Sequence, residues 1–180
     1  MLDELFVDLK HEIKMGYLKK RHPFRWVTLA TTDEQTGTRM RTVVLRDCRE
    51  ELNLLFYTDG RSTKIDQIKR DPRASVLLYH PKKLLQLTVY GKLLLHTSGP
   101  DYENRWAGIP EKSRKDYITE RPPGSPIANP DEVDYQNKHH FTLMELVPER
   151  VDYLRLKRPN HLRATFERVE GDWQGQWLVP

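Results

Sequence analysis

Hydroxyl and cationic side chains gather at one turn of this sequence, directly before a predicted helix. Ser62-Thr63-Lys64 follow the turn dipeptide Asp59-Gly60, and the helix that they open extends to Arg70, where Asp71-Pro72 ends it. A helix N-terminus presents free backbone N–H groups, so a lysine and hydroxyls beside it favour an anion such as phosphate. Serine or threonine at a helix start also often acts only as the cap, and both interpretations remain open.

A run rich in β-branched residues precedes this turn and carries arginine at both ends. Residues 39–46 are predicted to form one strand and residues 52–58 the next. Arg41, and Arg46 at the end of the strand, would add charge-assisted hydrogen bonds to the same anion. Because the two arginines are an odd number of residues apart, they face opposite sides of a flat strand. Both reach one ligand only if the strand bends or the ligand wraps its end.

The remaining pattern predicts a mostly antiparallel fold around these residues. Apolar residues at helical spacing indicate an amphipathic helix to about Lys14, within an N-terminal segment 1–20. The longest strand, residues 84–97, alternates cleanly and is interrupted by Gly91, which marks a bulge or bend. Further strands are expected at residues 25–32, 73–79, 141–147, 150–157, 164–169 and 173–179. Many short strands with few helices predict a mainly β barrel with peripheral helices, of class α+β.

Residues 98–140 differ in kind from the rest of the chain. They carry six of the twelve prolines and little periodicity, although short helices are expected at residues 102–107 and 112–118. Long irregular segments inside a compact domain are often functional lids or binding loops. The chain is therefore predicted to be one domain, residues 1–180, with residues 98–140 as a proline-rich lid or interface insertion.

Composition and charge narrow the functional class only moderately. The 180 residues are 37% hydrophobic, and 30 basic residues nearly balance 26 acidic ones, which weakens a nucleic-acid-binding interpretation. No apolar run approaches membrane-spanning length, and the N-terminus lacks the basic lead-in of a secretory signal. The single Cys48 forms no internal disulfide and is interpreted as a turn cysteine. A cytoplasmic protein without membrane or nucleic-acid partners is expected.

The order of several short motifs resembles that of the pyridoxamine 5'-phosphate oxidase-related proteins. The motifs are Arg41-Thr-Val-Val-Leu-Arg46, Phe56-Tyr-Thr58, Ser62-x-Lys64, Gln86-Leu-Thr-Val-Tyr-Gly91, Pro148-Glu-Arg-Val-Asp-Tyr153 and His161-Leu-Arg163. The resemblance covers residues 25 to 178 and is specific only when the motifs are taken as a set. It implies a split β-barrel of the FMN-binding type, a homodimer with FMN at the subunit interface, and flavin-mediated redox of a small-molecule substrate.

The same resemblance implies which residues form the site. The cofactor-binding residues would be Arg41, Thr42, Val43, Val44, Leu45, Arg46, Tyr57, Thr58, Ser62, Thr63, Lys64, Gln86 and Arg163. Ser62 and Lys64 would bind the FMN phosphate, and the Gln86 amide, which both donates and accepts, would reach the ring edge. His161 and Arg163 would be the catalytic residues that orient substrate or cofactor. Substrate residues are expected among Arg105, Trp106, Ser113 and Arg114.

Three residues depart from the oxidase pattern. Pro159 stands where the oxidase has the first arginine of its substrate motif, Thr63 where it has a phosphate-binding arginine, and Leu154 where it has a tryptophan near the flavin. These departures weigh against pyridoxamine phosphate oxidation more than against FMN binding. One alternative is a non-catalytic binder of FMN, haem or another flavin on the same fold. A less favoured alternative is a nucleic-acid-binding barrel.

No metal site is predicted from the sequence. His139 and His140 are adjacent and project differently, and the chain has neither an H-E-x-x-H motif nor a cysteine cluster.

Overall fold

One antiparallel sheet forms most of the protein. The computed structural model describes residues 1–49 and 51–180. Within these residues the strands are β1 (Trp26–Asp33), β2 (Gly37–Val44), β3 (Asp47–Cys48), β4 (Leu54–Asp59), β5 (Arg73–His80), β6 (Leu85–His96), β7 (Phe141–Arg155), β8 (Leu162–Val169) and β9 (Asp172–Trp177). The helices are α1 (Leu2–Leu18), η1 (Pro23–Arg25), α2 (Thr63–Arg70), α3 (Pro100–Ala107), α4 (Glu111–Arg114) and η2 (Lys115–Tyr117).

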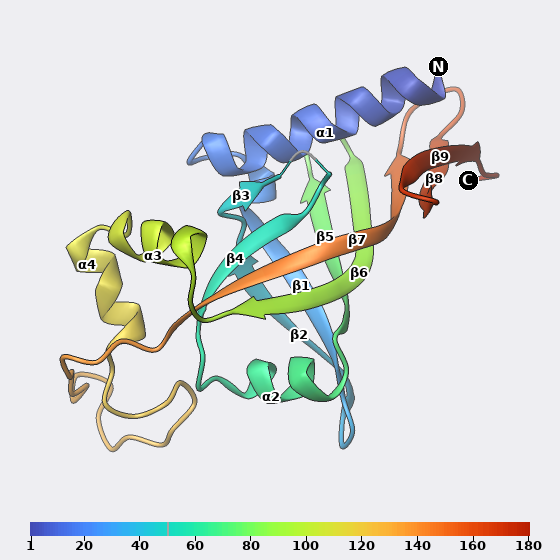
Figure 1. Cartoon of the computed structure of the whole chain (residues 1–180). Helices are drawn as coiled ribbons and strands as arrows, with labels where there is room; N and C mark the ends of the chain where they lie inside the picture. The colour runs from blue at the N-terminus through green and yellow to red at the C-terminus, as the bar shows by residue number, and fades with distance from the viewer. Residues whose placement is uncertain (50) are drawn as a thin grey trace.

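The strands curl around a core in the order β2-β1-β5-β6-β7-β4-β3. The β8–β9 hairpin extends from the far end of β7, and α1 runs across one end of the sheet (Figure 1). Segments α3 and α4 lie at the other side of the molecule, so β7 connects two separate regions (Figure 1). None of the described helices is long and apolar enough to cross a membrane.

The N-terminal helix closes the core, as its apolar spacing predicts. Leu5, Leu9 and Ile13 are buried along one face of α1. The helix continues to Leu18, four residues beyond the predicted end, and its backbone approaches Phe24 closely at Gly16. A Cβ at Gly16 would lie 2.8 Å from the Phe24 Cβ, so this close approach requires glycine.

The predicted alternation of β6 is confirmed, and its glycine is a bulge. The β6–β7 register shifts between Tyr90 and Gly91. A Cβ at Gly91 would lie 2.0 Å from the Val147 carbonyl oxygen. The bulge also accounts for an error: residues 141–157 were predicted as two strands, yet β7 is continuous through Pro148. Proline is tolerated in a strand where a bulge interrupts the hydrogen-bond ladder.

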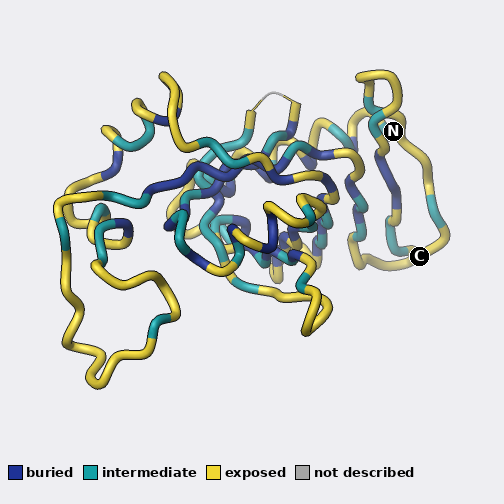
Figure 2. Tube along the Cα trace, turned by 60° about the horizontal axis from the view of Figure 1, so that its bottom comes forward, coloured by how far each residue is buried: buried dark blue, intermediate teal, exposed yellow. Residues whose placement is uncertain are grey.

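The segment after β6 packs on β4 and β7 through a second apolar cluster. The predicted helices there are present as α3, and as α4 followed by η2. The buried residues of this cluster are Leu55, Tyr102, Ile109, Tyr117, Phe141 and Leu143. Residues 118–140 follow, largely exposed and with little regular structure beyond an isolated Thr119–Tyr135 bridge (Figure 2).

Candidate functional site

Three polar side chains meet where β4 ends and α2 begins. Lys64 Nζ donates to Thr58 Oγ1 and to Ser62 Oγ, each at 3.0 Å. The Ser62 hydroxyl donates to the Asp59 carbonyl oxygen at 2.8 Å and does not cap the helix that it precedes. The capping alternative for Ser62 is therefore wrong, because its hydroxyl orients the lysine instead.

Arg41 reaches the same corner from β2. Its guanidinium donates to Thr31 Oγ1 at 2.6 Å and to Gln67 Oε1 at 2.9 Å. Gln67 is buried on α2 and lies one turn after Lys64, so both side chains share a helix face. Sequence reasoning missed Gln67, although its i,i+3 spacing from Lys64 was a usable signal.

Arg41 and Lys64 bring two positive charges together. Burial lowers the pKa of Lys64, and the nearby Arg41 charge lowers it further. Among the described residues, no carboxylate forms an ion pair with either cation. Arg41, Thr58, Ser62 and Lys64 are called the anion cradle below. Two cations beside two hydroxyls, without a direct ion pair to a carboxylate among the described residues, fit a phosphate ester, which supplies negative charge.

Arg46 lies beside Tyr57 and does not take part in the anion cradle. Strand β2 ends at Val44, so the prediction that residues 39–46 form one strand is wrong at its C-terminal end. The Arg46 guanidinium lies 5.1 Å from the Tyr57 ring centroid, and its Nε is buried without a hydrogen-bond partner among residues 1–49 and 51–180. Arg46 thus lies beyond the strand, where side-chain alternation no longer applies: Arg41 reaches the cradle and Arg46 does not.

A cavity of about 610 Å³ opens beside Arg46 and Tyr57. Its basic lining residues are Lys20, Arg25, Arg46 and Arg105. Arg105 is held by Asp47 at 2.8 Å and by Asp101 at 2.9 Å, whereas the Arg46 Nε has no hydrogen-bond partner in the part of the chain that the structure describes. An unpartnered buried donor at the edge of a basic cavity fits an anionic or hydrogen-bond-accepting ligand.

Of the expected substrate residues, Arg105 and Ser113 line this cavity. Trp106 instead stacks on His139 with ring centroids 4.1 Å apart. Arg114 donates to the Ile109 and Ala107 carbonyl oxygens, which fixes the α3–α4 connection.

Gln86 and Arg163 form a separate strip. Gln86 on β6 pairs in register with Leu154 on β7, which pairs with Arg163 on β8. Thr58 of the cradle pairs with Thr142, twelve residues before Leu154 on β7. At about 3.3 Å per residue this is roughly 40 Å along the strand. Within one chain, the strip and Thr58 therefore lie at opposite ends of β7.

The other predicted residues occupy varied positions. Thr42, Val43 and Val44 pair with β1, and Leu45 is buried in the core. Thr63 is exposed on the first turn of α2, away from the cradle hydrogen bonds. The His161 Nδ1 accepts from the Lys157 N–H at 3.1 Å, which anchors the loop before β8. Burial raises the pKa of Cys48 to about 12, so its thiol stays protonated. This agrees with a structural role for the cysteine.

Glu12, His22 and His80 form another titratable group, with their ligand-capable atoms within 4.8 Å of one another. His22 Nδ1 accepts from the Phe24 N–H at 3.1 Å, and His80 Nδ1 accepts from the Lys83 N–H at 3.3 Å. Both neutral rings therefore carry their proton on Nε2, and the His22 Nε2 lies 3.5 Å from Glu12 Oε2. A metal ligated by Nε2 would require the opposite tautomer, so the arrangement disfavours a metal centre.

Comparison with known proteins identifies the family. Residues 6–97 match the family model described as "Pyridoxamine 5'-phosphate oxidase, FMN-binding domain". The chain belongs to the pyridoxamine 5'-phosphate oxidase family. The matched residues of this family member include the anion cradle and Gln86, and they end just after β6. The family assignment, the split-barrel fold and FMN as the cofactor are confirmed.

Individual relatives of this oxidase-family chain agree with the assignment. A pyridoxine/pyridoxamine 5'-phosphate oxidase 2 of Arabidopsis thaliana is 31% identical over 153 residues, covering 76% of each chain. A crystal structure of a related FMN-binding protein from Nostoc punctiforme superposes with a TM-score of 0.78 at 25% identity, covering 97% of this chain and 96% of that one. PhzG from Burkholderia lata has the same fold, with a TM-score of 0.78 at 16% identity and 98% and 92% coverage.

Proposed function

We propose that this protein is an FMN-dependent oxidoreductase that acts on a small anionic substrate. The observation that supports this most directly is that Arg41 and Lys64 lie together beside two hydroxyls, and within the described part of the chain neither forms an ion pair with a carboxylate. A phosphate ester dianion would take charge-assisted hydrogen bonds from both cations. Bound FMN would supply the two-electron chemistry, and the protein would hold the substrate against it and exclude competing reactions.

The basic cavity beside Arg46 is the proposed substrate site. The buried Arg46 Nε lacks a partner among the described residues and would donate there, and Tyr57 provides an aromatic wall. These groups would orient a phosphate or carboxylate of the substrate, while Arg105 is already neutralised by its two acids. A substrate held in this way has already lost translational and rotational entropy, so less entropy is lost on reaching the transition state.

The site is proposed to be completed by a second copy of the chain. Several large apolar side chains stand exposed on the outer face of the sheet. These residues are Trp26, Met40, Leu77, Tyr79 and Tyr90, and they are called the outer face. Tyr79 pairs with Gln86, so the outer face is continuous with the Gln86–Leu154–Arg163 strip. A two-fold contact through this surface would bury it and bring each strip toward the partner's cradle.

The experiment begins with the absorption spectrum of the purified protein and the flavin released on denaturation. Pyridoxamine 5'-phosphate and other phosphate or carboxylate amines are then mixed anaerobically with the FMN-loaded protein. Bleaching of the flavin band, followed by recovery when oxygen is admitted, is the expected result. Absence of FMN binding by the apoprotein would overturn the proposal.

Pro159 and Thr63 favour a second candidate, a flavin-binding protein without turnover. Both stand where the oxidase pattern has an arginine for substrate or phosphate. This candidate predicts tight FMN binding with no substrate-dependent bleaching, so the anaerobic experiment separates the two functions.

A further inference from the structure

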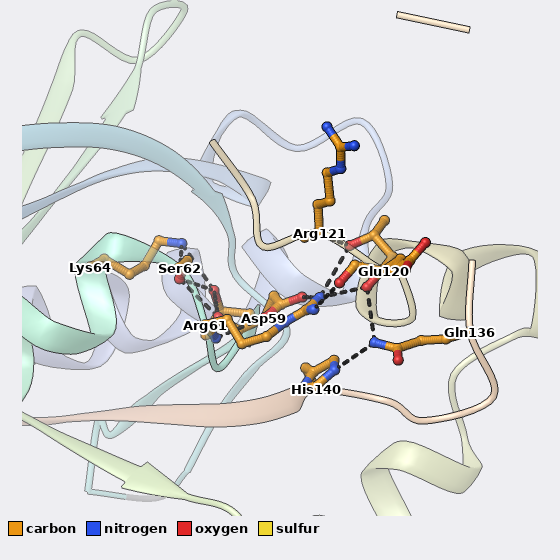
Figure 3. Close-up of polar contacts among 10 residues, drawn as sticks. Asp59, Arg61, Ser62, Lys64, Glu120, Arg121, Gln136 and His140 are labelled. Carbon is orange, nitrogen blue, oxygen red and sulfur yellow. Dashed lines mark hydrogen bonds and ion pairs between the residues drawn. The ribbon is translucent and has the colours of Figure 1, made fainter. Parts of the chain in front are cut away.

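Arg61 lies at the centre of a polar network that the cradle does not use directly (Figure 3). It follows Gly60 in the turn between β4 and α2, next to Ser62. Its guanidinium pairs with the buried Asp59 carboxylate, with Nη2 to Oδ2 at 2.7 Å and Nε to Oδ1 at 3.1 Å. The backbone N–H of Arg61 also donates to Asp59 Oδ1 at 2.8 Å. The turn is thus braced by a bidentate pair between its own residues.

The same guanidinium binds a segment 58 residues later in the chain. Nη2 donates to the Thr119 carbonyl oxygen at 2.8 Å, and Nη1 donates to the Glu120 carbonyl oxygen at 2.9 Å. Two consecutive carbonyl groups of the proline-rich segment are therefore attached to the turn that carries the cradle. A lysine ammonium lacks the planar fork that makes these contacts together with the pair to Asp59.

Residues 117–140 form a stem around this attachment. Gln136 donates from its backbone N–H to the Ile118 carbonyl oxygen at 2.8 Å and from Nε2 to the Thr119 carbonyl oxygen at 3.3 Å. The His140 N–H donates to the Tyr117 carbonyl oxygen, and the Gly60 N–H donates to the His140 carbonyl oxygen, each at 2.7 Å. The stem therefore contacts the turn twice, through Gly60 and through Arg61.

Asp59 links this network to the cradle. Its carbonyl oxygen accepts from the Ser62 hydroxyl, and its carboxylate lies close enough to Lys64 to act on the charge of the ammonium. Without Arg61, a buried carboxylate would stand unpaired beside the cradle and repel an entering phosphate. Arg61 therefore neutralises Asp59 and holds the stem with one group.

We propose that Arg61 is a positioning residue that couples occupancy of the anion cradle by a phosphate ester to ordering of the 117–140 stem. The inference rests on the proposed function because it takes FMN as the phosphate ester. Coupling is reciprocal: whatever loosens the stem weakens phosphate binding by the same factor by which phosphate tightens the stem. The stem lies on the α3–α4 side of the molecule, so the cofactor phosphate would help to shape the substrate side.

Hydrogen exchange of peptides from residues 117–140, followed with and without FMN or inorganic phosphate, tests the coupling. In the wild-type protein, FMN is expected to slow exchange in the stem. Arg61→Ala is expected to speed stem exchange, because the bonds to Thr119 and Glu120 are lost. It is also expected to weaken FMN binding by about tenfold or more, because Asp59 is left unpaired beside the cradle. In Arg61→Ala, the stem should no longer respond to FMN. Arg61→Lys is expected to recover part of both effects, because its ammonium still neutralises Asp59.

Arg73→Ala is the matched control. Arg73 pairs with Asp71 at the same i,i+2 spacing and with Nη2 to Oδ2 also at 2.7 Å, but it contacts no part of the stem. Its substitution is expected to leave stem exchange and FMN affinity within about twofold of wild type, as an exposed pair contributes little.

Gln136→Ala loosens the stem without touching the cradle, and it carries the test if Arg61→Ala does not fold. Weaker FMN binding together with faster stem exchange supports the coupling. Faster exchange with unchanged FMN affinity, or weaker binding with unchanged exchange, overturns it. A wild-type protein that binds no FMN refutes the proposed function instead; inorganic phosphate then replaces FMN, and a stem that does not respond to phosphate overturns the coupling.

Discussion

Lys64 Nζ lies 3.0 Å from the hydroxyl oxygen of Ser62, two residues before it in the chain. The serine hydroxyl donates its own proton to the Asp59 carbonyl oxygen, so its lone pair is left to accept from the lysine. This arrangement fixes the ammonium over the start of α2. Backbone N–H groups at the helix start, Lys64 and Arg41 can then act on one anion.

Lys64→Ala is expected to raise the dissociation constant for FMN. A hydrogen bond to a charged group is worth about 1.5–3 kcal/mol, which corresponds to a roughly tenfold to hundredfold loss of affinity. The dissociation constant is measured from the quenching of FMN fluorescence as the apoprotein is titrated with FMN. Lys69→Ala, an exposed lysine on the same helix, is the control and should bind FMN normally. Unchanged affinity in both Lys64→Ala and Arg41→Ala would rule out the cradle.

FMN affinity should depend on pH in two directions. Below about pH 6 the phosphate monoester loses its second charge, so binding weakens on acidification. On the alkaline side, burial and the Arg41 charge lower the pKa of Lys64, so its proton is lost at lower pH than from a free lysine. Binding should therefore also weaken as pH rises through that lowered pKa. In Lys64→Ala the alkaline decline should move to higher pH, and an identical profile would contradict the assignment.

A site shared between two chains predicts complementation. Lys64→Ala removes the cradle cation, and Arg163→Ala removes the strip cation on the opposite end of β7. If each site uses the cradle of one protomer and the strip of its partner, a heterodimer of the two variants contains one site with both residues intact. Co-expression with two different tags should restore about half of the wild-type FMN binding to the purified heterodimer. Binding no better than in the single variants would show that one chain supplies both groups.

Much of this arrangement could be predicted from local sequence signals. Turn dipeptides and alternation locate β4, α2 and β6, because their causes are local in the chain. The end of β2 before Arg46 and the continuity of β7 through Pro148 depend on partner strands and a bulge. Such tertiary effects leave little trace in a single sequence.

The sequence predicted the kinds of residue in the candidate site better than it predicted which of them lie together. Arg41, Ser62 and Lys64 lie together as expected, whereas Gln86 on β6 and Arg163 on β8 flank the other end of β7. The Asp59–Arg61 pair was missed because an i,i+2 acid and base in a turn usually mark only a surface contact. Its partners, Thr119 and Glu120, are 58 or more residues away, and no sequence spacing indicates them.

The Glu12–His22–His80 group should make the protein sensitive to acid. Burial lowers the pKa of His22 below its ordinary value of 6.5, so the unfolded chain binds this proton more readily than the folded protein. Stability from this residue is therefore present above about pH 6.5 and is lost as pH falls below it. Burial opposes ionisation of Glu12, but Lys83 and the two histidines outweigh it and lower the Glu12 pKa. The stability that Glu12 contributes to the folded protein is therefore lost only as pH falls below its ordinary pKa of 4.5.

Urea unfolding between pH 7.5 and 5 measures this dependence. His22→Gln should flatten the slope between pH 6.5 and 5, while His11→Gln, an exposed histidine on α1, should not. Zinc should not raise the melting temperature, because the Nε2 tautomers oppose coordination. A large zinc-dependent stabilisation would show that the rings adopt the other tautomer.

The bulge at Gly91 predicts a strong and specific stability effect. A Cβ there would lie 2.0 Å from the Val147 carbonyl oxygen and 2.9 Å from Pro148 Cα, and both are backbone atoms that cannot rotate away. Gly91→Ala must therefore shift β6 against β7, at a cost of about 1–3 kcal/mol or more in unfolding free energy. Gly108→Ala is the control, because Gly108 has φ −75° and its nearest contact would be 3.4 Å away. Denaturant unfolding should show a lower midpoint for Gly91→Ala only; equal midpoints would mean that the strands relax around the added methyl group and that the bulge does not require glycine.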